Sequence, residues 1–147
     1  MRDVRVQLDN FDPGHEQARL ETLDVGAIAT FTGLVRGDDG VDQLHLEHYP
    51  GMTERSLSIL CEEACARWSL EGVILIHRVG PLAVGDRIVF VGTASAHRAS
   101  ALEACAFLID RLKTDAPFWK KERVSGQERW VEARASDDAA SNRWRSS

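Results

Sequence analysis

The order of strand-like and helix-like segments constrains the fold of this chain more than any other feature. Seven segments have the apolar, β-branched or alternating character of strands: 4–8, 26–35, 44–49, 73–79, 87–93, 118–124 and 128–133. Three segments have helical spacing: 15–23, 53–68 and 96–113. The resulting order, β-α-β-β-α-β-β-α-β-β, predicts a single α+β domain with a largely antiparallel mixed sheet and covering helices, not a doubly wound parallel sheet.

Short turn signals join six of these strands in pairs. Residues 36–40 are Arg-Gly-Asp-Asp-Gly, residues 81–86 contain Pro81 with Gly85-Asp86, and residues 125–127 are Ser-Gly-Gln. Since each signal connects two strands that are close in sequence, we expect three β-hairpins. The domain is expected to span 1–134. The tail, 135–147, is polar apart from Trp144, so it is either disordered or docked through that ring.

The second and third helices each have a candidate N-cap and an inward stripe. Thr53 and Ser95 are the candidate caps, and Pro117 is expected to end the third helix. The expected inward residues are Leu57, Leu60, Cys61, Ala64 and Cys65 in the second helix, and Leu102, Cys105, Ile109 and Leu112 in the third.

Composition excludes several classes of protein. A chain of 147 residues that is 44% hydrophobic can bury one ordinary core. It has no run long enough to cross a bilayer and no signal-peptide core after Met1, so we expect a soluble, cytoplasmic protein with no membrane contact. A net charge of -5 argues against non-specific binding to nucleic acid.

Metal, disulfide and nucleotide sites lack their usual motifs. Three cysteines without a CxxC pair do not suit a disulfide framework, and Cys61 and Cys65 are more typical of a helix core than of a metal site. His45, His48 and His77 lack zinc-ligand spacing, so we interpret them as strand-surface or core residues. P-loop, GxGxxG and GxSxG motifs are absent. We predict neither a metal nor a bound cofactor.

His97 and Arg98 lie where a strand passes into a helix. Backbone N–H groups, the helix dipole, an imidazole and a guanidinium could together bind an anion there. The alternative is a solvated first turn. Cationic side chains are unfavourable at a helix N-terminus, which favours the anion site.

Three lysines surround a Pro-aromatic break near the end of the chain: Lys113, Lys120 and Lys121. Pro117 prevents Lys113 and Lys120 from sharing one helix face, so their proximity depends on a turn. Phe118 and Trp119 could form an apolar wall that lowers the pKa of a lysine ammonium group. Alternatively, the aromatic rings anchor the core and the lysines extend to solvent.

Arg36 belongs to a turn whose glycines permit a ligand to approach the backbone closely. A solvated loop arginine is the commoner explanation of such a residue.

Six ordered blocks between about 25 and 134 resemble the large, catalytic subunit of molybdopterin synthase. They are FTGLVR (31–36), LEHYPGMTE (46–54), HRVG (77–80), GTASAHR (92–98), LKTDAPFWK (112–120) and WVEA (130–133). The resemblance implies a sulfurtransferase of molybdenum cofactor biosynthesis. Such an enzyme converts cyclic pyranopterin monophosphate into the molybdopterin dithiolene, with sulfur from the Gly-Gly thiocarboxylate of a small ubiquitin-like subunit. It also implies a heterotetramer built on a homodimer of large subunits.

The same resemblance implies roles for individual residues. Lys113 and Lys120 would act at the reacting centre. The residues that would hold the substrate or line its pocket are Leu34, Val35, Arg36, His97, Arg98, Lys121, Glu122 and Arg134.

One position departs from the resemblance, because Leu34 stands where many relatives carry lysine. Leu34 is therefore expected to contribute backbone at most. Two other functions stay open on the residues alone: a non-catalytic module that binds an anionic metabolite and dimerises, and an enzyme that uses the same cations on another acyl or phosphoryl substrate.

Overall fold

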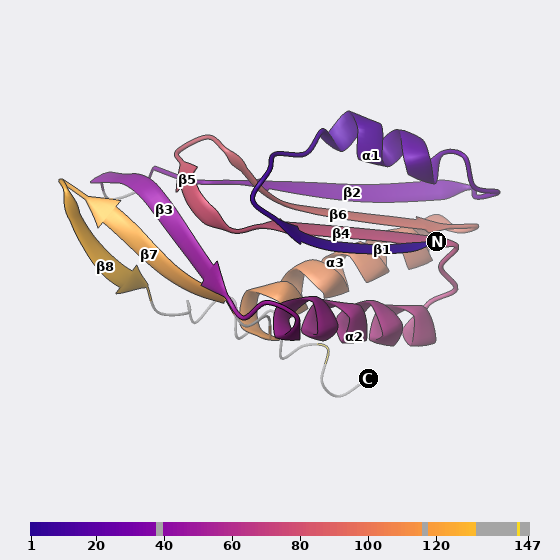
Figure 1. Ribbon diagram of the computed structural model, residues 1–147. Helices are drawn as coiled ribbons and strands as arrows, with labels where there is room; N and C mark the ends of the chain where they lie inside the picture. Colours follow the sequence, from indigo (N-terminus) through magenta and orange to yellow (C-terminus); the bar gives the residue numbers. More distant parts are fainter. Residues whose placement is uncertain (38–39, 116–117, 132–143, 145–147) are drawn as a thin grey trace.

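Two four-stranded sheets and three helices make up the fold (Figure 1). The computed structural model describes residues 1–37, 40–115, 118–131 and 144. The first sheet has the strand order β1-β4-β6-β2 and the second β5-β3-β7-β8. In chain order the elements are β1 (Arg2–Gln7), α1 (Pro13–Leu20), β2 (Ala27–Leu34), β3 (Val41–His48), α2 (Met52–Arg67), β4 (Gly72–Arg78), β5 (Gly80–Ala83), β6 (Arg87–Ser95), α3 (Arg98–Asp115), β7 (Phe118–Val124) and β8 (Gln127–Val131).

The predicted α+β class and largely antiparallel pairing are confirmed, and β5 is an additional short strand. The hairpins β4–β6 and β7–β8 form as expected, while β1 and β4 are parallel. The expected hairpin between β2 and β3 is wrong. β2 pairs with β6, whereas β3 pairs with β5 and β7 in the other sheet.

The break between β2 and β3 has a packing reason. Val35, directly after β2, is buried with Leu44 and Leu46 of β3 and Leu82 of β5. This small apolar cluster packs β3 against β5. Since β3 belongs to the other sheet, β2 pairs with the edge of β6 instead. Alternating strand residues show which face is buried, but they do not show which strand is the partner.

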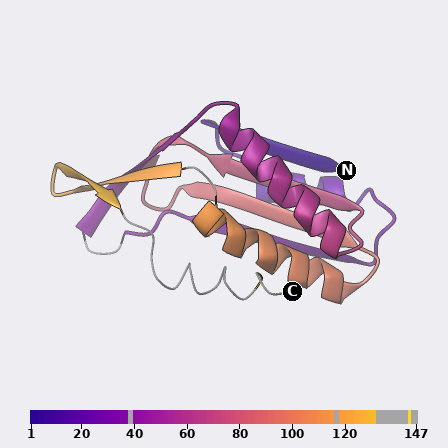
Figure 2. The same cartoon turned by 90° about the horizontal axis from the view of Figure 1, so that it is seen from below.

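The central strand β4 is buried on both faces. Val73 and Leu75 face α2 and α3, which lie side by side across one face of the first sheet (Figure 2). Ile74 and Ile76 face the other side, in the cluster that contains Leu20 of α1. Because side chains alternate along a strand, the next odd residue, His77, extends the α2–α3 side toward the end of the sheet.

Both predicted N-caps are wrong. α2 begins at Met52 after Gly51, whose φ is 83°, and the Glu54 carboxylate accepts a hydrogen bond of 2.6 Å from the Gly51 N–H. Thr53 lies inside the helix and donates its hydroxyl to the Tyr49 carbonyl. Ser95 ends β6 and donates its hydroxyl to the Ser69 carbonyl.

The expected stripe of α3 is correct except at its first position. Cys105 and Leu112 are buried, but Leu102 is 61% exposed. Ala101 occupies the buried position instead, and a helix turns by about 100° per residue, so the next side chain points outward. α3 ends at Asp115, and Pro117 lies outside the described residues.

Trp144 docks on the helices. Its ring packs edge-on against Trp68 and Phe107 at centroid distances of 5.8 and 5.7 Å, and its Nε1 donates to the Asp110 carboxylate at 2.6 Å. Docking through the ring is therefore the alternative that the structure supports for Trp144. The predicted boundary at 134 lies outside the described residues.

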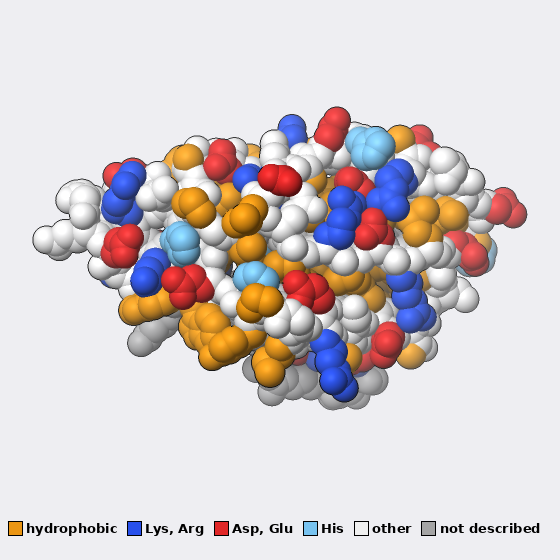
Figure 3. Space-filling model, in the orientation of Figure 1, with side chains coloured by type: hydrophobic (Ala, Val, Ile, Leu, Met, Phe, Trp, Pro, Cys, Tyr) orange, Lys and Arg blue, Asp and Glu red, His pale blue; other side chains and the backbone are white. Residues whose placement is uncertain are grey.

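Large hydrophobic side chains are exposed where β3 ends and α2 begins (Figure 3). They include Tyr49, Met52 and Trp119, and the Tyr49 and Trp119 rings pack edge-on at 4.4 Å. Among the described helices, none is long and apolar enough to cross a membrane.

Candidate active site

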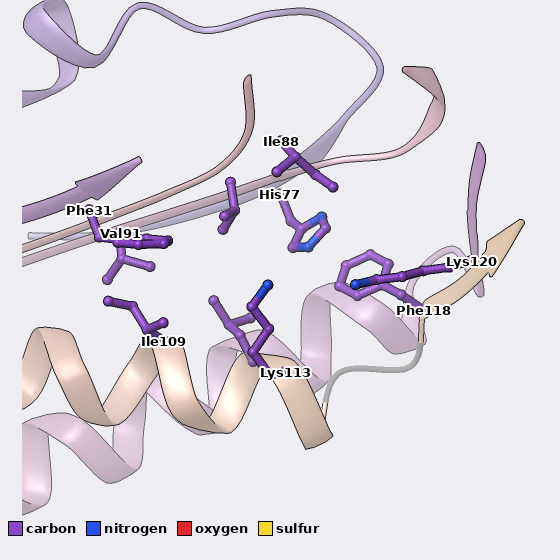
Figure 4. Close-up of a pocket in the computed structure, with 10 residues that line it drawn as sticks. Phe31, His77, Ile88, Val91, Ile109, Lys113, Phe118 and Lys120 are labelled. Atoms are coloured by element: carbon purple, nitrogen blue, oxygen red, sulfur yellow. The ribbon is translucent and has the colours of Figure 1, made fainter. Parts of the chain in front are cut away.

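A pocket opens where the C-terminal end of α3 meets the first sheet and β7 (Figure 4). Its apolar lining comes from Phe31, Ile88, Val89, Val91, Ile109, Leu112 and Phe118. Its polar lining consists of His77 on β4, Lys113 on α3 and Lys120 on β7. The pocket therefore combines an apolar wall with three nitrogen-bearing side chains from three different elements.

Lys113 and Lys120 reach this pocket by different routes. Lys113 is exposed in the last turn of α3, where its charge also complements the helix dipole. Lys120 is half-buried, and it lies in β7. Figure 4 shows both ammonium ends directed toward the His77 ring. The fold thus brings α3 and β7 together so that Lys113 and Lys120 line one pocket, a proximity that the sequence alone could not establish.

His77 is the residue of this pocket that sequence reasoning missed. Its ring is 9% exposed and stacks on Phe118, with a centroid distance of 3.9 Å and an interplanar angle of 23°. Burial, with the positive charges of Lys120 and Lys113, lowers its pKa from 6.5 to about 4. The available signal was a lone histidine at the end of an otherwise apolar strand, which is also typical of a core histidine.

The two aromatic residues at the start of β7 have different roles. Phe118 faces the pocket and forms the expected apolar wall. Trp119, one residue further along the strand, projects from the opposite face and contacts Tyr49. Of the two rings, Phe118 is therefore the one that lines the pocket with Lys113 and Lys120.

Lys121 and Glu122 do not line the described pocket, contrary to expectation. Lys121 alternates with Lys120 and lies on the other face of β7, 3.9 Å from the Glu47 carboxylate and over the Trp130 ring. Glu122 shares the Lys120 face, but its carboxylate accepts a hydrogen bond of 3.1 Å from Arg129. Glu122, which the resemblance placed in the substrate pocket, therefore forms an ion pair with Arg129.

The segment from Leu34 to Arg36 lies at the same end of the sheet as the pocket. Strand register aligns His77 with Val89 and Val89 with Gly33, so β2 ends beside the pocket. Leu34 is 55% exposed, and Val35 is a buried core residue. Arg36 follows them as an exposed side chain at the pocket end of the sheet.

His97 and Arg98 are far from the two lysines. Both are exposed at the start of α3, and Lys113 is at its other end. Fifteen residues at 1.5 Å each separate Arg98 from Lys113 by about 22 Å along the helix. Within one chain, His97 and Arg98 therefore do not lie beside the two pocket lysines. Arg134 lies outside the described residues.

The local chemistry at His97 and Arg98 still suits an anion. Within the described chain, the first turn of α3 carries no acidic residue that could offset the Arg98 guanidinium. The Ala101 N–H donates to the His97 carbonyl at 3.2 Å, so helical hydrogen bonding begins there. A guanidinium and an imidazole at the positive end of a helix dipole favour a negatively charged ligand.

The two buried cysteines, Cys61 and Cys105, are poor candidates for chemistry. Burial raises the pKa of Cys61 to about 12 and of Cys105 to about 11. Their thiols therefore stay protonated near neutral pH. No group of three or more potential metal ligands occurs in the described part of the chain.

Comparison with known proteins identifies the family. The family model described as "MoaE protein" matches residues 6–115. A "Molybdopterin synthase catalytic subunit" from Yersinia pestis is 52% identical over 145 residues, which cover 96% of each chain. The MoaE protein structure from Burkholderia ambifaria has a TM-score of 0.84 and 49% identity, and covers 98% of each chain. The molybdopterin synthase structure from Staphylococcus aureus has a TM-score of 0.75 and 33% identity, and covers 86% of this chain and 95% of its own. The chain therefore belongs to the MoaE protein family.

Proposed function

We propose that this chain is the catalytic subunit of molybdopterin synthase and transfers sulfur to cyclic pyranopterin monophosphate. The observation that carries the proposal is the pocket shared by Lys113 and Lys120, in a chain whose close relatives are named catalytic subunits of this enzyme. The sulfur donor is the C-terminal thiocarboxylate of a small ubiquitin-like partner that ends in Gly-Gly.

The charges of the pocket suit this reaction. A thiocarboxylate and a cyclic phosphate are both anionic, so fixed cations are needed to bring them together. The two ammonium groups neutralise the approaching thiocarboxylate and stabilise the phosphate oxygen that is released when the ring opens. They can also donate or accept the protons that accompany these steps. The apolar lining strengthens each of these interactions by excluding water.

A homodimer accounts for the distant cations. If His97 and Arg98 hold the substrate phosphate, a second copy of the chain must supply them, because about 22 Å of helix separates them from Lys113. A two-fold interface can bring the start of one α3 to the pocket of the other chain. Arg36, at the pocket end of the first sheet, adds a positive charge from the same chain as the lysines.

The assembly also needs a surface for a protein partner. Tyr49, Met52 and Trp119 form an exposed apolar group beside β7, the strand that carries Lys120 (Figure 3). Exposed apolar groups of this kind are typical of protein contacts. This group supports the proposed heterotetramer of two copies of this chain and two small subunits.

Reconstitution tests the proposed function. The purified chain is mixed with a thiocarboxylated small subunit and cyclic pyranopterin monophosphate, and the dithiolene product is assayed. We expect product only when all three are present. Binding of the pterin without any product, beside a competent partner, would instead show a non-catalytic binding module.

A further inference from the structure

His77 is the titratable residue of the described pocket lining that the proposed function leaves unused. Its ring is fixed on two sides. Phe118 stacks on one face, and Nδ1 lies 2.8 Å from the Arg78 carbonyl oxygen. Because a carbonyl only accepts, Nδ1 must carry the proton and donate it. In the neutral ring, Nε2 then carries the free lone pair.

The surroundings of His77 keep this ring neutral. The groups that face it are Lys113 from α3, Lys120 from β7 and His48 from β3. Its register partners in the sheet, Val6 of β1 and Val89 of β6, are apolar. Protonation would add a third positive charge to a buried site, and the pKa of about 4 reflects this cost.

A neutral acceptor has a specific use beside two ammonium groups. A carboxylate would orient a lysine more strongly, but it would also cancel the charge that an anionic substrate needs. A neutral imidazole can accept one N–H of an ammonium group and leave its net charge intact. The remaining N–H groups then point into the pocket.

We propose that His77 is a positioning residue for sulfur transfer: its Nε2 accepts a hydrogen bond from a lysine ammonium group of the pocket and orients that group toward the anionic reactants. The inference rests on the proposed function and adds a residue to its site. It assigns no covalent step to the imidazole.

Two substitutions separate positioning from packing. His77→Phe keeps a flat ring against Phe118 but removes Nε2, and His77→Gln restores an acceptor near that position. We expect His77→Phe to lower kcat by about tenfold or more, with KM for the pterin changed by less than about twofold. His77→Gln should recover most of kcat. His45→Gln serves as the matched control, because the His45 side chain is 41% exposed and lies on the face of β3 opposite His48.

The pH profile gives a readout that packing alone would not move. An accepted hydrogen bond stabilises the charged ammonium group, so its loss should shift the alkaline limb of the kcat profile to lower pH in His77→Phe. The inference is overturned if His77→Phe keeps kcat within about twofold of wild type. Equal losses in both variants with an unchanged profile would also overturn it. Absence of product from the wild-type chain would instead contradict the proposed function.

A measurement on the wild-type chain covers the case in which both variants fail to fold. Nitrogen NMR of the His77 ring should show the Nδ1–H tautomer, still neutral at pH 6. A ring that titrates near its ordinary pKa of 6.5, or that carries its proton on Nε2, would overturn the proposal.

Discussion

Single residues decide the chemistry of the pocket through their charge. Lys113 and Lys120 bring two positive charges to a wall that includes Phe118, and His77 stays neutral between them. The sequence drew attention to the lysines because they surround a Pro-aromatic break, and the resemblance implied a role for Lys113 and Lys120. It did not identify His77, because a histidine in a buried strand acquires its role only from side chains that the fold brings to it.

Removing either pocket lysine should abolish sulfur transfer. Lys113→Ala and Lys120→Ala each delete a cation that offsets two anionic reactants, so we expect a loss of about 10²-fold or more in kcat. Lys121→Ala is the matched control, because Lys121 lies on the opposite face of β7. Circular dichroism should show that all three variants keep the fold. Near-normal turnover by either pocket variant would contradict the assigned role.

His77 should also make stability depend on pH. Its pKa is about 4 in the folded chain and 6.5 when unfolded, so the unfolded chain binds more protons in between. The contribution of His77 to the free energy of unfolding is fully present above pH 6.5. It falls by about 3 kcal/mol as the pH drops to 4. Urea unfolding at pH 7 and 4.5 measures this loss, which should be smaller in His77→Phe. An equal loss in that variant would show that other groups cause it.

At the scale of elements, local patterns were predictive where a structure depends on near neighbours. The antiparallel pairs β4–β6 and β7–β8 flank predicted turn residues, although Pro81 of the first turn signal lies in the short strand β5. The pairing of β2 with β6 depends on a cluster around Val35 that forms only when distant segments meet. Helix starts were also misjudged, because Thr53 and Ser95 form other hydrogen bonds with the backbone.

The start of α2 offers a direct test of helix capping. Glu54 accepts the Gly51 N–H, and Glu54→Ala leaves that donor without its partner. We expect the free energy of unfolding to fall by about 1 kcal/mol, measured by urea denaturation. Glu62→Ala, an exposed acidic residue later in the same helix, should change it by less than about 0.5 kcal/mol. Equal effects of the two substitutions would contradict the capping role.

At the scale of the whole molecule, one chain does not bring all its cations together. His97 and Arg98 lie at one end of α3 and Lys113 at the other. The sequence predicted an anion site at the start of this helix, and the resemblance placed Lys113 at the reacting centre, but neither could show their separation within one chain. A complete site built from two copies follows from this geometry and from the proposed homodimer.

Mixed dimers test this sharing. We expect the Arg98→Ala and Lys113→Ala variants each to be inactive alone. We also expect the purified protein to be a homodimer without the small subunit, with twice the 16.3 kDa mass of one chain. When mixed, half of the dimers contain one of each variant, and one of their two sites has both residues intact. Activity should therefore return to about a quarter of wild type, assayed as dithiolene formation. No recovery from a verified mixed dimer would place both residues in one site of the same chain, or outside the site.

If this pocket moves sulfur from a thiocarboxylate to a cyclic pterin, the small subunit must lose that sulfur. Intact-mass spectrometry of the small subunit measures it most directly, because its thiocarboxylate becomes a carboxylate when sulfur leaves. We expect conversion with the wild-type chain and cyclic pyranopterin monophosphate, and none with the Lys113→Ala/Lys120→Ala double variant. Conversion at the wild-type rate by the double variant, or no conversion by the wild-type chain with a competent partner, would contradict it.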